Sequence, residues 1–483
     1  MKKNQKKIIF SIFFWTDYES RWLKINHSRN ILISIVLLTS IIVTTIVYSA
    51  FSTQLQINGE AIVRSDNDIR ITGVKIINQT NNAYETYNNK YTKETTSMFV
   101  TLPSNSSITY EVEITNKSDK KYSLTNIEIL SNTNNNITYE ISANKYDIYE
   151  SNTVSKINIF IKNDTDDFEE EILAIKFTFK ESQATFLAGS LFNAKIKQLA
   201  TNDNSVTHLT SDTEINKIVR ASELNVTIDD SYIISTADST VPIYAWYDSG
   251  IIYYYSKINE LFLNADSSYM FYNLTNLDDI SFDNINSSKV ISMQKMFQNC
   301  FNIKNLDLSN FNTSNVTNMS QMFYACKELE EVNVSSFNTS NVTSMYQMFT
   351  NNEKLKKLNL DNFDTSKVVS MQRMFYYDYK LTELNISNFN TSKVENMLDM
   401  FANCSSLKEL DISTFNMNKV TSLNTNGFGF LIGMSSLEKL KTPKVYPNGL
   451  SITLPKTLYD ENSNSYTILD STSPIQTWLK VNE

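Results

Sequence analysis

Histidine, cysteine, proline and glycine are all scarce, and the 483-residue chain contains two, three, six and eight of them. Outside residues 1–50, a catalytic group of the Ser-His-Asp or Cys-His type would have to use His208, and no nucleophile motif surrounds that residue. The sequence has no phosphate-binding glycine loop, no G-x-G-x-x-G fingerprint and no H-E-x-x-H motif. We therefore expect a protein that is not an enzyme, binds no metal and needs no cofactor.

Acidic residues outnumber basic ones, at 52 Asp and Glu against 43 Lys and Arg, and the net charge is −9. An acidic exterior repels phosphate backbones, so we expect no nucleic-acid partner. The many carboxylates also offer many pairs of the kind that hydrolyse sugars. A hydrolase is therefore the catalytic alternative to a binding protein.

One uncharged and mostly apolar run, ILISIVLLTSIIVTTIVYSA, occupies residues 31–50 and is long enough to span a bilayer. Residues 1–30 carry an excess of Lys and Arg, which favours a cytoplasmic N-terminus. The pattern predicts a basic cytoplasmic segment at 1–30, a transmembrane signal anchor at 31–50 and a single-pass protein of the cell membrane whose C-terminal part is extracellular. The alternative is a cleaved signal peptide and a secreted protein, because small residues such as Ala50 offer a cleavage site.

The pair Met-Phe recurs every 26 residues, beginning at Met270, Met296, Met322, Met348, Met374 and Met400. Such a unit cannot bury its apolar side alone, so strict repetition predicts a solenoid in which the copies stack. We expect the solenoid at residues 265–441, a linker and N-terminal cap at 182–264, and a C-terminal cap at 442–483. Leu423 replaces the expected Met in the last copy, as an atypical end of the array would require.

Two periods coexist within each copy. Leu306 and Leu308 alternate with Asp307 and Ser309, which predicts a short strand with one face inward. A second apolar stripe has helical spacing and consists of Val316, Met319, Met322 and Phe323. The predicted fold class is therefore an α/β leucine-rich-repeat solenoid, a parallel sheet with short helical returns, preceded by a β-sandwich domain and one N-terminal transmembrane helix.

Short alternating segments precede the repeats, for example TYEVEIT at 109–115 and SKINIFI at 155–161. Clusters of Asn, Ser, Thr and Asp separate them. This spacing predicts an antiparallel sandwich of immunoglobulin-like shape at residues 51–181, which would act as a stalk.

The repeat reads Met-Phe-x-x-Cys-x-x-Leu-x-x-Leu-Asp-Leu-Ser-x-Phe-Asn-Thr-Ser-x-Val-Thr-x-Met. Over residues 265–441 it resembles the BspA-like leucine-rich repeat surface proteins. The resemblance implies a bacterial cell-surface protein used for adhesion. Its implied partner is a surface protein or glycan of a host or neighbouring cell, with the N-terminal helix in the membrane.

The outward positions of the predicted strands are the candidate ligand-binding face. They are polar or charged in every copy and comprise Asp307, Asn333, Asn359, Asn385, Asp411, Glu331, Lys357, Glu383 and Glu409. Curved repeat proteins commonly bind partners along such a surface. The alternative is a hydrated face that only keeps the sheet soluble, in a structural envelope or spacer protein without a specific ligand.

Two further groups of residues stand out in the repeats. Tyr376, Tyr377 and Tyr379 cluster at the turn of one copy and form a second candidate contact. The three cysteines, Cys300, Cys326 and Cys404, share one column of the repeat, which predicts a structural ladder position. Cys300 and Cys326 belong to adjacent copies and would lie within reach of a disulfide.

Overall fold

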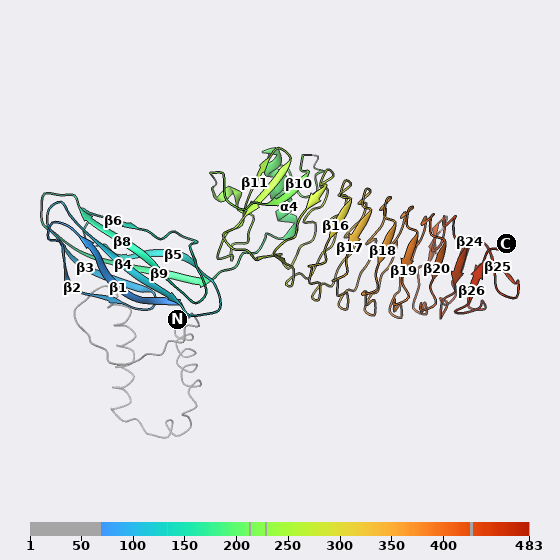
Figure 1. The fold of residues 1–483 in the computed structure, drawn as a ribbon. Coiled ribbons are helices and arrows are strands. Elements are labelled where there is room, and N and C mark those ends of the chain that lie inside the picture. The colour runs from blue at the N-terminus through green and yellow to red at the C-terminus, as the bar shows by residue number, and fades with distance from the viewer. Residues whose placement is uncertain (1–68, 133, 212–213, 228, 426–427, 483) are drawn as a thin grey trace, which may run out of the picture. The chain divides into compact units, whose positions relative to one another are not determined.

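The computed structural model describes residues 69–132, 134–211, 214–227, 229–425 and 428–482 (Figure 1). Strands dominate these residues. Helical structure among them is limited to α4 (Gly189–Thr201) and the 3₁₀ turn η1 (Asp230–Tyr232).

Residues 69–181 form two antiparallel sheets, with strand orders β1-β4-β8-β6 and β2-β3-β9-β5-β7. Burial alternates along the long strands, so every second side chain enters one core shared by both sheets. This part is a β-sandwich, and its immunoglobulin-like character and stalk role stay predictions. Its strands are β1 (Ile69–Gln79), β2 (Tyr84–Tyr91), β3 (Thr95–Leu102), β4 (Ser106–Asn116), β5 (Tyr122–Ser131), β6 (Ile137–Ile141), β7 (Ile148–Tyr149), β8 (Thr153–Asn163) and β9 (Glu169–Glu181).

The segment before the repeats combines α4 with a small sheet of order β11-β12-β10-β14 and the parallel pair β13-β15, in which β14 and β15 come from the first copy. Its aromatic side chains join the core of the first copy, where Phe192 lies edge-on to Phe271 at 5.9 Å between ring centroids. The strands are β10 (Lys217–Arg220), β11 (Tyr244–Asp248), β12 (Ile251–Tyr255), β13 (Leu261–Phe262), β14 (Asp279–Ile280) and β15 (Ile285–Asn286).

One face of α4 closes the hydrogen-bond ladder of the array. In the turns around Met-Phe, each copy donates backbone N–H groups to carbonyls of the next copy, so the carbonyls of the first such turn have no earlier copy to bond them. Donors four residues apart on α4 replace that copy, namely the amide of Gly189 and the side chains of Asn193 and Lys197. The carbonyls that they bond, at N···O distances of 2.8 to 3.1 Å, belong to Asp266, Met270 and Tyr272.

The repeats form a β-solenoid whose coils each contribute one short strand to parallel pairings. The strands are β16 (Asn305–Asp307), β17 (Glu331–Asn333), β18 (Lys357–Asn359), β19 (Glu383–Asn385) and β20 (Glu409–Asp411). A second parallel ladder links single residues 26 apart on another side of the coil, from Asp266 through Ser292, Asn318, Ser344, Ser370 and Asn396 to Ser422.

The predicted helical returns, and with them the α/β leucine-rich-repeat class, are wrong. In a helix the amides bond carbonyls of their own chain segment, whereas here every second amide bonds the next copy. Phe297, for example, donates to Met322 of the next copy at 2.9 Å, while Met296 closes a three-residue turn onto Met293 at 3.2 Å. Residues with positive φ, such as Lys295 at 58° and Asn299 at 62°, break the helical path twice in each copy.

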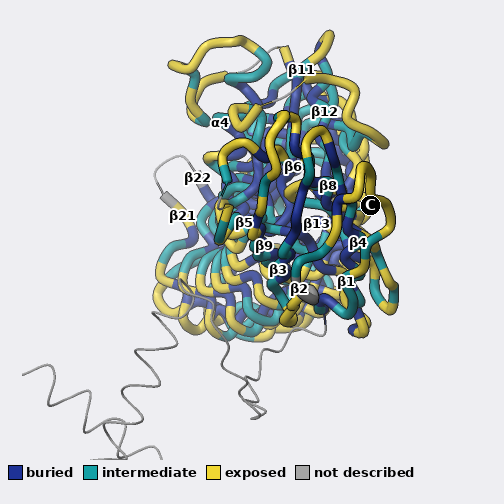
Figure 2. Tube along the Cα trace, turned by 90° about the vertical axis from the view of Figure 1, so that its left-hand side faces the viewer, coloured by how far each residue is buried: buried dark blue, intermediate teal, exposed yellow. Residues whose placement is uncertain are grey.

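The interior of the array is a continuous stack of identical residues. Phe297 lies parallel to Phe323 at 5.9 Å, Phe349 follows at 5.3 Å, and Phe375 at 6.0 Å. The Met and Phe residues of these stacks are buried, and Figure 2 shows exposed residues on the outer turns of the coils. The stacks confirm that the 26-residue copies lie side by side.

An antiparallel sheet closes the C-terminal end of the array. It continues from β20 in the order β20-β23-β26-β24-β25, and the terminal strands cover the last parallel pair. Its strands are β23 (Lys439–Lys441), β24 (Ile452–Tyr459), β25 (Ser465–Leu469) and β26 (Trp478–Lys480), and a short hairpin of β21 (Asn424–Thr425) and β22 (Phe428–Gly429) precedes it.

No helix among the residues that the structure describes is long and apolar enough to cross a membrane. This finding overturns the predicted fold class with a transmembrane helix and the predicted single-pass localisation. The predicted cytoplasmic segment at 1–30 and signal anchor at 31–50 lie outside the described residues.

Candidate functional site

The nine residues predicted to bind a ligand lie together on one side of the coils, which we call the strand face. Seven are exposed, and Asn333 and Asp411 are half-buried. Neighbouring strands are in register, so Asp307 lies beside Asn333 and Lys357 beside Glu383. The structure thus brings these residues together, and their ligand-binding role stays a prediction.

Charged residues of the strand face pair with one another across adjacent coils. The Lys357 ammonium lies 2.7 Å from the Glu383 carboxylate, and Glu409 lies 3.6 Å from Lys439. Both pairs are well exposed, so each contributes at most about 1 kcal/mol to stability. Because the nine residues include five carboxylates and one ammonium group, these pairs leave the strand face negatively charged.

The middle column of the strand face also has a structural role that the sequence interpretation missed. In each copy, the Oδ1 atom accepts the backbone N–H two residues later and starts a turn. The acceptors are Asp307, Asn333, Asn359, Asn385 and Asp411, at 2.8 to 3.2 Å. The bond from Ser309 holds the pKa of Asp307 below its usual value. The sequence could have predicted these turns, because Asn and Asp side chains commonly accept the backbone N–H two residues later.

The Thr of each Phe-Asn-Thr-Ser motif forms hydrogen bonds to the next coil. The hydroxyl of Thr313 donates to the Asn338 carbonyl at 2.9 Å and accepts the Asn338 amide at 2.8 Å in the next copy. Thr365 makes the same two bonds to Asn390, at 3.0 and 2.8 Å. These threonines are fully buried and therefore have no contact with solvent.

The cysteines are buried thiols that bond backbone carbonyls. Cys300 donates to Phe271 at 3.0 Å, Cys326 to Phe297 at 3.2 Å and Cys404 to Phe375 at 3.0 Å. Burial raises the pKa of Cys326 to about 12 and raises those of the other two well above the usual value. Such thiols are poor nucleophiles and metal ligands.

Asp378 occupies the same column as the cysteines and is fully buried. One carboxyl oxygen accepts the Asn352 amide at 2.8 Å, while the other, Oδ2, has no hydrogen-bond partner among the residues that the structure describes. Burial raises the pKa of this carboxyl well above its usual value. The sequence alone marks Asp378 as unusual, because the other copies have Leu, Cys or Asn at this position.

Three tyrosines of the fifth copy form a cluster of neighbouring rings, which we call the tyrosine platform: Tyr376, Tyr377 and Tyr379. Tyr379 is exposed and the other two are half-buried, and adjacent ring planes are tilted by 49° and 35°. The first two ring centroids are 4.1 Å apart, and the last two 5.4 Å. The guanidinium of Arg373 lies 5.1 Å from the Tyr376 ring centroid, and its Nε and Nη2 atoms are each 3.1 Å from the Asp399 carboxylate.

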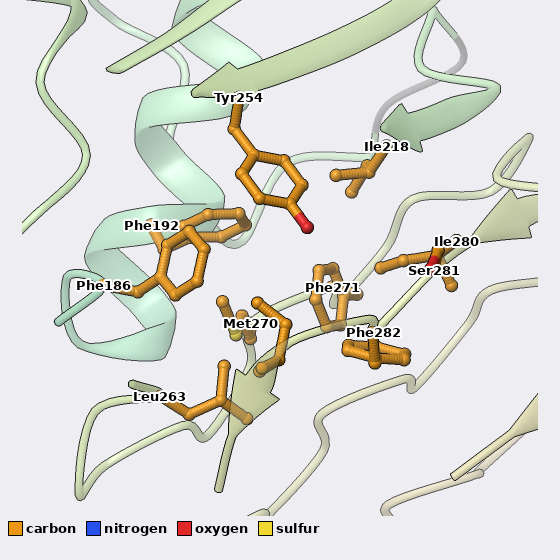
Figure 3. A pocket seen from close by; sticks show the side chains of 11 residues that line it. Phe186, Phe192, Ile218, Tyr254, Leu263, Met270, Phe271, Ile280, Ser281 and Phe282 are labelled. Atoms are coloured by element: carbon orange, nitrogen blue, oxygen red, sulfur yellow. The ribbon is translucent and has the colours of Figure 1, made fainter. Parts of the chain in front are cut away.

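A small apolar cavity of about 20 Å³ lies between α4, the preceding sheet and the first copy. Phe186, Phe192, Met270 and Phe271 are among its lining residues, and Figure 3 shows the Tyr254 hydroxyl turned toward them. This volume is close to that of one water molecule, which would need two or more polar partners. We therefore do not assign a ligand to it.

His208 packs edge-on against Tyr269, with 5.3 Å between ring centroids. Its backbone carbonyl accepts a hydrogen bond from Lys197 at 3.4 Å, and burial followed by the Lys197 charge lowers the pKa of its imidazole. Within the described part of the chain, no cluster of three or more His, Cys, Asp or Glu residues is arranged to hold a metal ion.

Comparison with known proteins supports the repeat array. Residues 265–358 and 351–427 match the family model described as a Mycoplasma protein of unknown function, DUF285. No curated protein and no solved structure matches the chain significantly. The narrower resemblance to BspA-like leucine-rich repeat proteins is not confirmed, and the chain is a repeat solenoid whose array is similar to DUF285.

Proposed function

We propose that this protein is a surface-type binding protein without catalytic activity, whose solenoid adheres to a protein or glycan on a host or neighbouring cell. The observation that carries the proposal is the strand face. Adjacent coils hold its exposed polar residues in register, so one long strip can contact an extended partner at many points.

The geometry favours polar over apolar partners. The inward side chains of β16 to β20, such as Leu306 and Leu358, are mostly buried, and the outward ones are amides, carboxylates and ammonium groups. The Oδ1 atoms of the middle column are engaged in turns, so contact with a partner would use the outward amide N–H groups and the charged column beside them. Partners that carry both hydrogen-bond donors and acceptors, such as hydroxyl groups, suit such a strip.

A triple Asn→Asp variant at Asn333, Asn359 and Asn385 tests this proposal. Each substitution keeps the Oδ1 acceptor that forms the turn and removes the Nδ2 donors. The labelled chain should bind saturably to intact cells, and the triple variant should bind at least about 10-fold more weakly if those donors carry the contact.

A matched control is the same substitution at Asn312, Asn338 and Asn390. These residues start an equivalent turn outside the strand face, and Asp364 already occupies that position in one copy. Equal losses in both triple variants would reflect added negative charge alone and would contradict a role for the strand face.

The second candidate function is a structural spacer without a specific ligand. The ion pairs and turn bonds within the strand face favour it, because they satisfy many of the polar atoms internally. Purely nonspecific and non-saturating retention of the chain on cells would support this alternative.

A further inference from the structure

We propose that the tyrosine platform is a stacking site for an uncharged glycan, distinct from the strand face. The proposal does not depend on the function proposed above, because the platform belongs to the turn that follows Met374 and Phe375. Aromatic ring faces bind other flat or weakly polar surfaces through the same forces that hold aromatic pairs.

The spacing of the rings excludes a cage for a cation. A cation held by several rings lies within about 6 Å of each ring centroid and needs space between the rings. Centroid separations of 4.1 and 5.4 Å leave no such space, because the rings are in contact with one another. The tyrosines therefore present a surface, on which a sugar ring can lie.

Two charged groups next to the rings are paired within the protein. Arg373 is paired with Asp399, and Glu353, which lies near Tyr379, is paired with Lys327 at 3.3 Å. A charged sugar would have to compete with these pairs. An uncharged sugar would not.

The platform is confined to one copy, so its size suits a sugar better than a protein. The same three positions carry Thr350, Asn351 and Glu353 in the preceding copy and Ala402, Asn403 and Ser405 in the following one. A stable protein interface covers about 800 Å² on each partner, far more than three side chains supply. The amide side chains of Asn351 and Asn403, both half-buried, flank the platform and can bond sugar hydroxyls.

The backbone at Tyr377 supports a role for its ring. Its φ is 62°, in the left-handed region, where four other copies have Asn and one has Ala. A bulky aromatic residue is costly in this conformation, and such strain is concentrated at functional positions. Nothing in the packing of the described residues requires an aromatic side chain there, since smaller residues complete the same turn elsewhere.

The platform is also held in place before any ligand arrives. Asp378 lies between Tyr377 and Tyr379 and accepts the Asn352 amide at 2.8 Å, which fixes the backbone between the two rings. Asp399 is fully buried and orients Arg373 over Tyr376. Such preorganisation reduces the entropy lost on binding.

The repeat itself supplies variants for the test. Tyr377→Asn and Tyr379→Ser introduce residues that other copies carry at these positions, so the double variant should fold with an unchanged or higher melting temperature. The full chain and the variant would be titrated with chitohexaose, maltohexaose and sialyllactose, with tyrosine fluorescence and calorimetry as readouts. We expect saturable binding of an uncharged hexasaccharide, and a loss of at least 10-fold in affinity in the double variant.

Two controls keep the result specific. Tyr324→Ala removes a tyrosine outside the platform, and the triple Asn→Asp variant alters only the strand face, so both should bind the sugar as the parent does. The proposal is overturned if no hexasaccharide binds saturably, if sialyllactose binds more tightly than both hexasaccharides, or if the platform variant binds unchanged. The glycan proposal would also be overturned if the platform variant lost binding to a protein while the parent chain bound no sugar. The strand-face proposal would then still be tested by its own variants.

Discussion

At the scale of single residues, Asp378 is the least expected feature of the core. Its column accepts Leu, Cys and Asn in other copies, all of which are neutral. A carboxyl group with one backbone partner and no contact with solvent is favoured in its protonated form, because ionisation would leave a buried charge unpaired. The thiol of Cys404 is the titratable group beside it in the next copy.

The raised pKa of Asp378 makes the stability of the folded chain depend on pH. Below about pH 4 both the folded and the unfolded chain hold the proton, so the residue has no pH-dependent effect. Above that pH the unfolded chain releases the proton while the folded chain keeps it. Stability therefore falls as the pH rises, by up to about 1.4 kcal/mol per pH unit until the folded pKa is reached.

Asp378→Asn should accordingly stabilise the array at pH 7.5, and the gain should vanish near pH 4. Denaturant unfolding at several pH values measures this. Asp364→Asn is the matched control, and its effect on stability should have the opposite sign. The bond from the Ser366 amide lowers the pKa of Asp364, so the ionised carboxylate stabilises the fold. That variant should lose stability at neutral pH and not near pH 3. A gain for Asp378→Asn that is equal at all pH values would contradict a titrating carboxyl.

At the scale of elements, bonds between coils decide the structure more than bonds within them. The strands are only three residues long, and the remaining turns depend on the next coil for half of their amide partners. The buried threonine ladder illustrates this dependence. Each hydroxyl satisfies both a carbonyl and an amide of the following coil.

Thr365→Val should destabilise the array by about 1 to 3 kcal/mol per group left without a partner. Valine has nearly the same shape, so the loss would report the two bonds to Asn390 rather than a cavity. Thr365→Ser should recover much of the stability. Thr343→Val is the control, because its hydroxyl bond to Thr317 is exposed, and thermal unfolding should show little change.

The α4 cap offers a second test of the ladder. A Cβ atom on Gly189 would lie 2.2 Å from the Ser268 carbonyl oxygen, so Gly189→Ala must push the helix away from the first coil. We expect a clear decrease in melting temperature. Gly73→Ala has its nearest neighbour at 3.7 Å and should be tolerated. Equal stability of the two variants would contradict the closing role of α4.

At the scale of the whole array, stacking makes each coil depend on both neighbours. Phe349 has parallel partners on both sides, at 5.3 and 6.0 Å, whereas Phe430 at the end meets only Phe401, edge-on at 5.2 Å, among the described rings. Phe349→Leu should therefore lower the melting temperature more than Phe430→Leu. Equal shifts would argue against a cooperative stack.

The sequence alone determined the period, the buried columns and the short strands, because inward positions must be apolar and their spacing therefore shows which residues are buried. It could not determine the path of the returns, since a spacing of three, three and one residues fits both a helix and two successive turns. Only the tertiary structure decided that path, because half of the amides there bond carbonyls 25 residues away, in the next coil. The strand face and the turn bonds of its middle column depend on local residue spacing and could be predicted from sequence, whereas the pairing of Arg373 with Asp399, 26 residues along the chain, required the stacked coils.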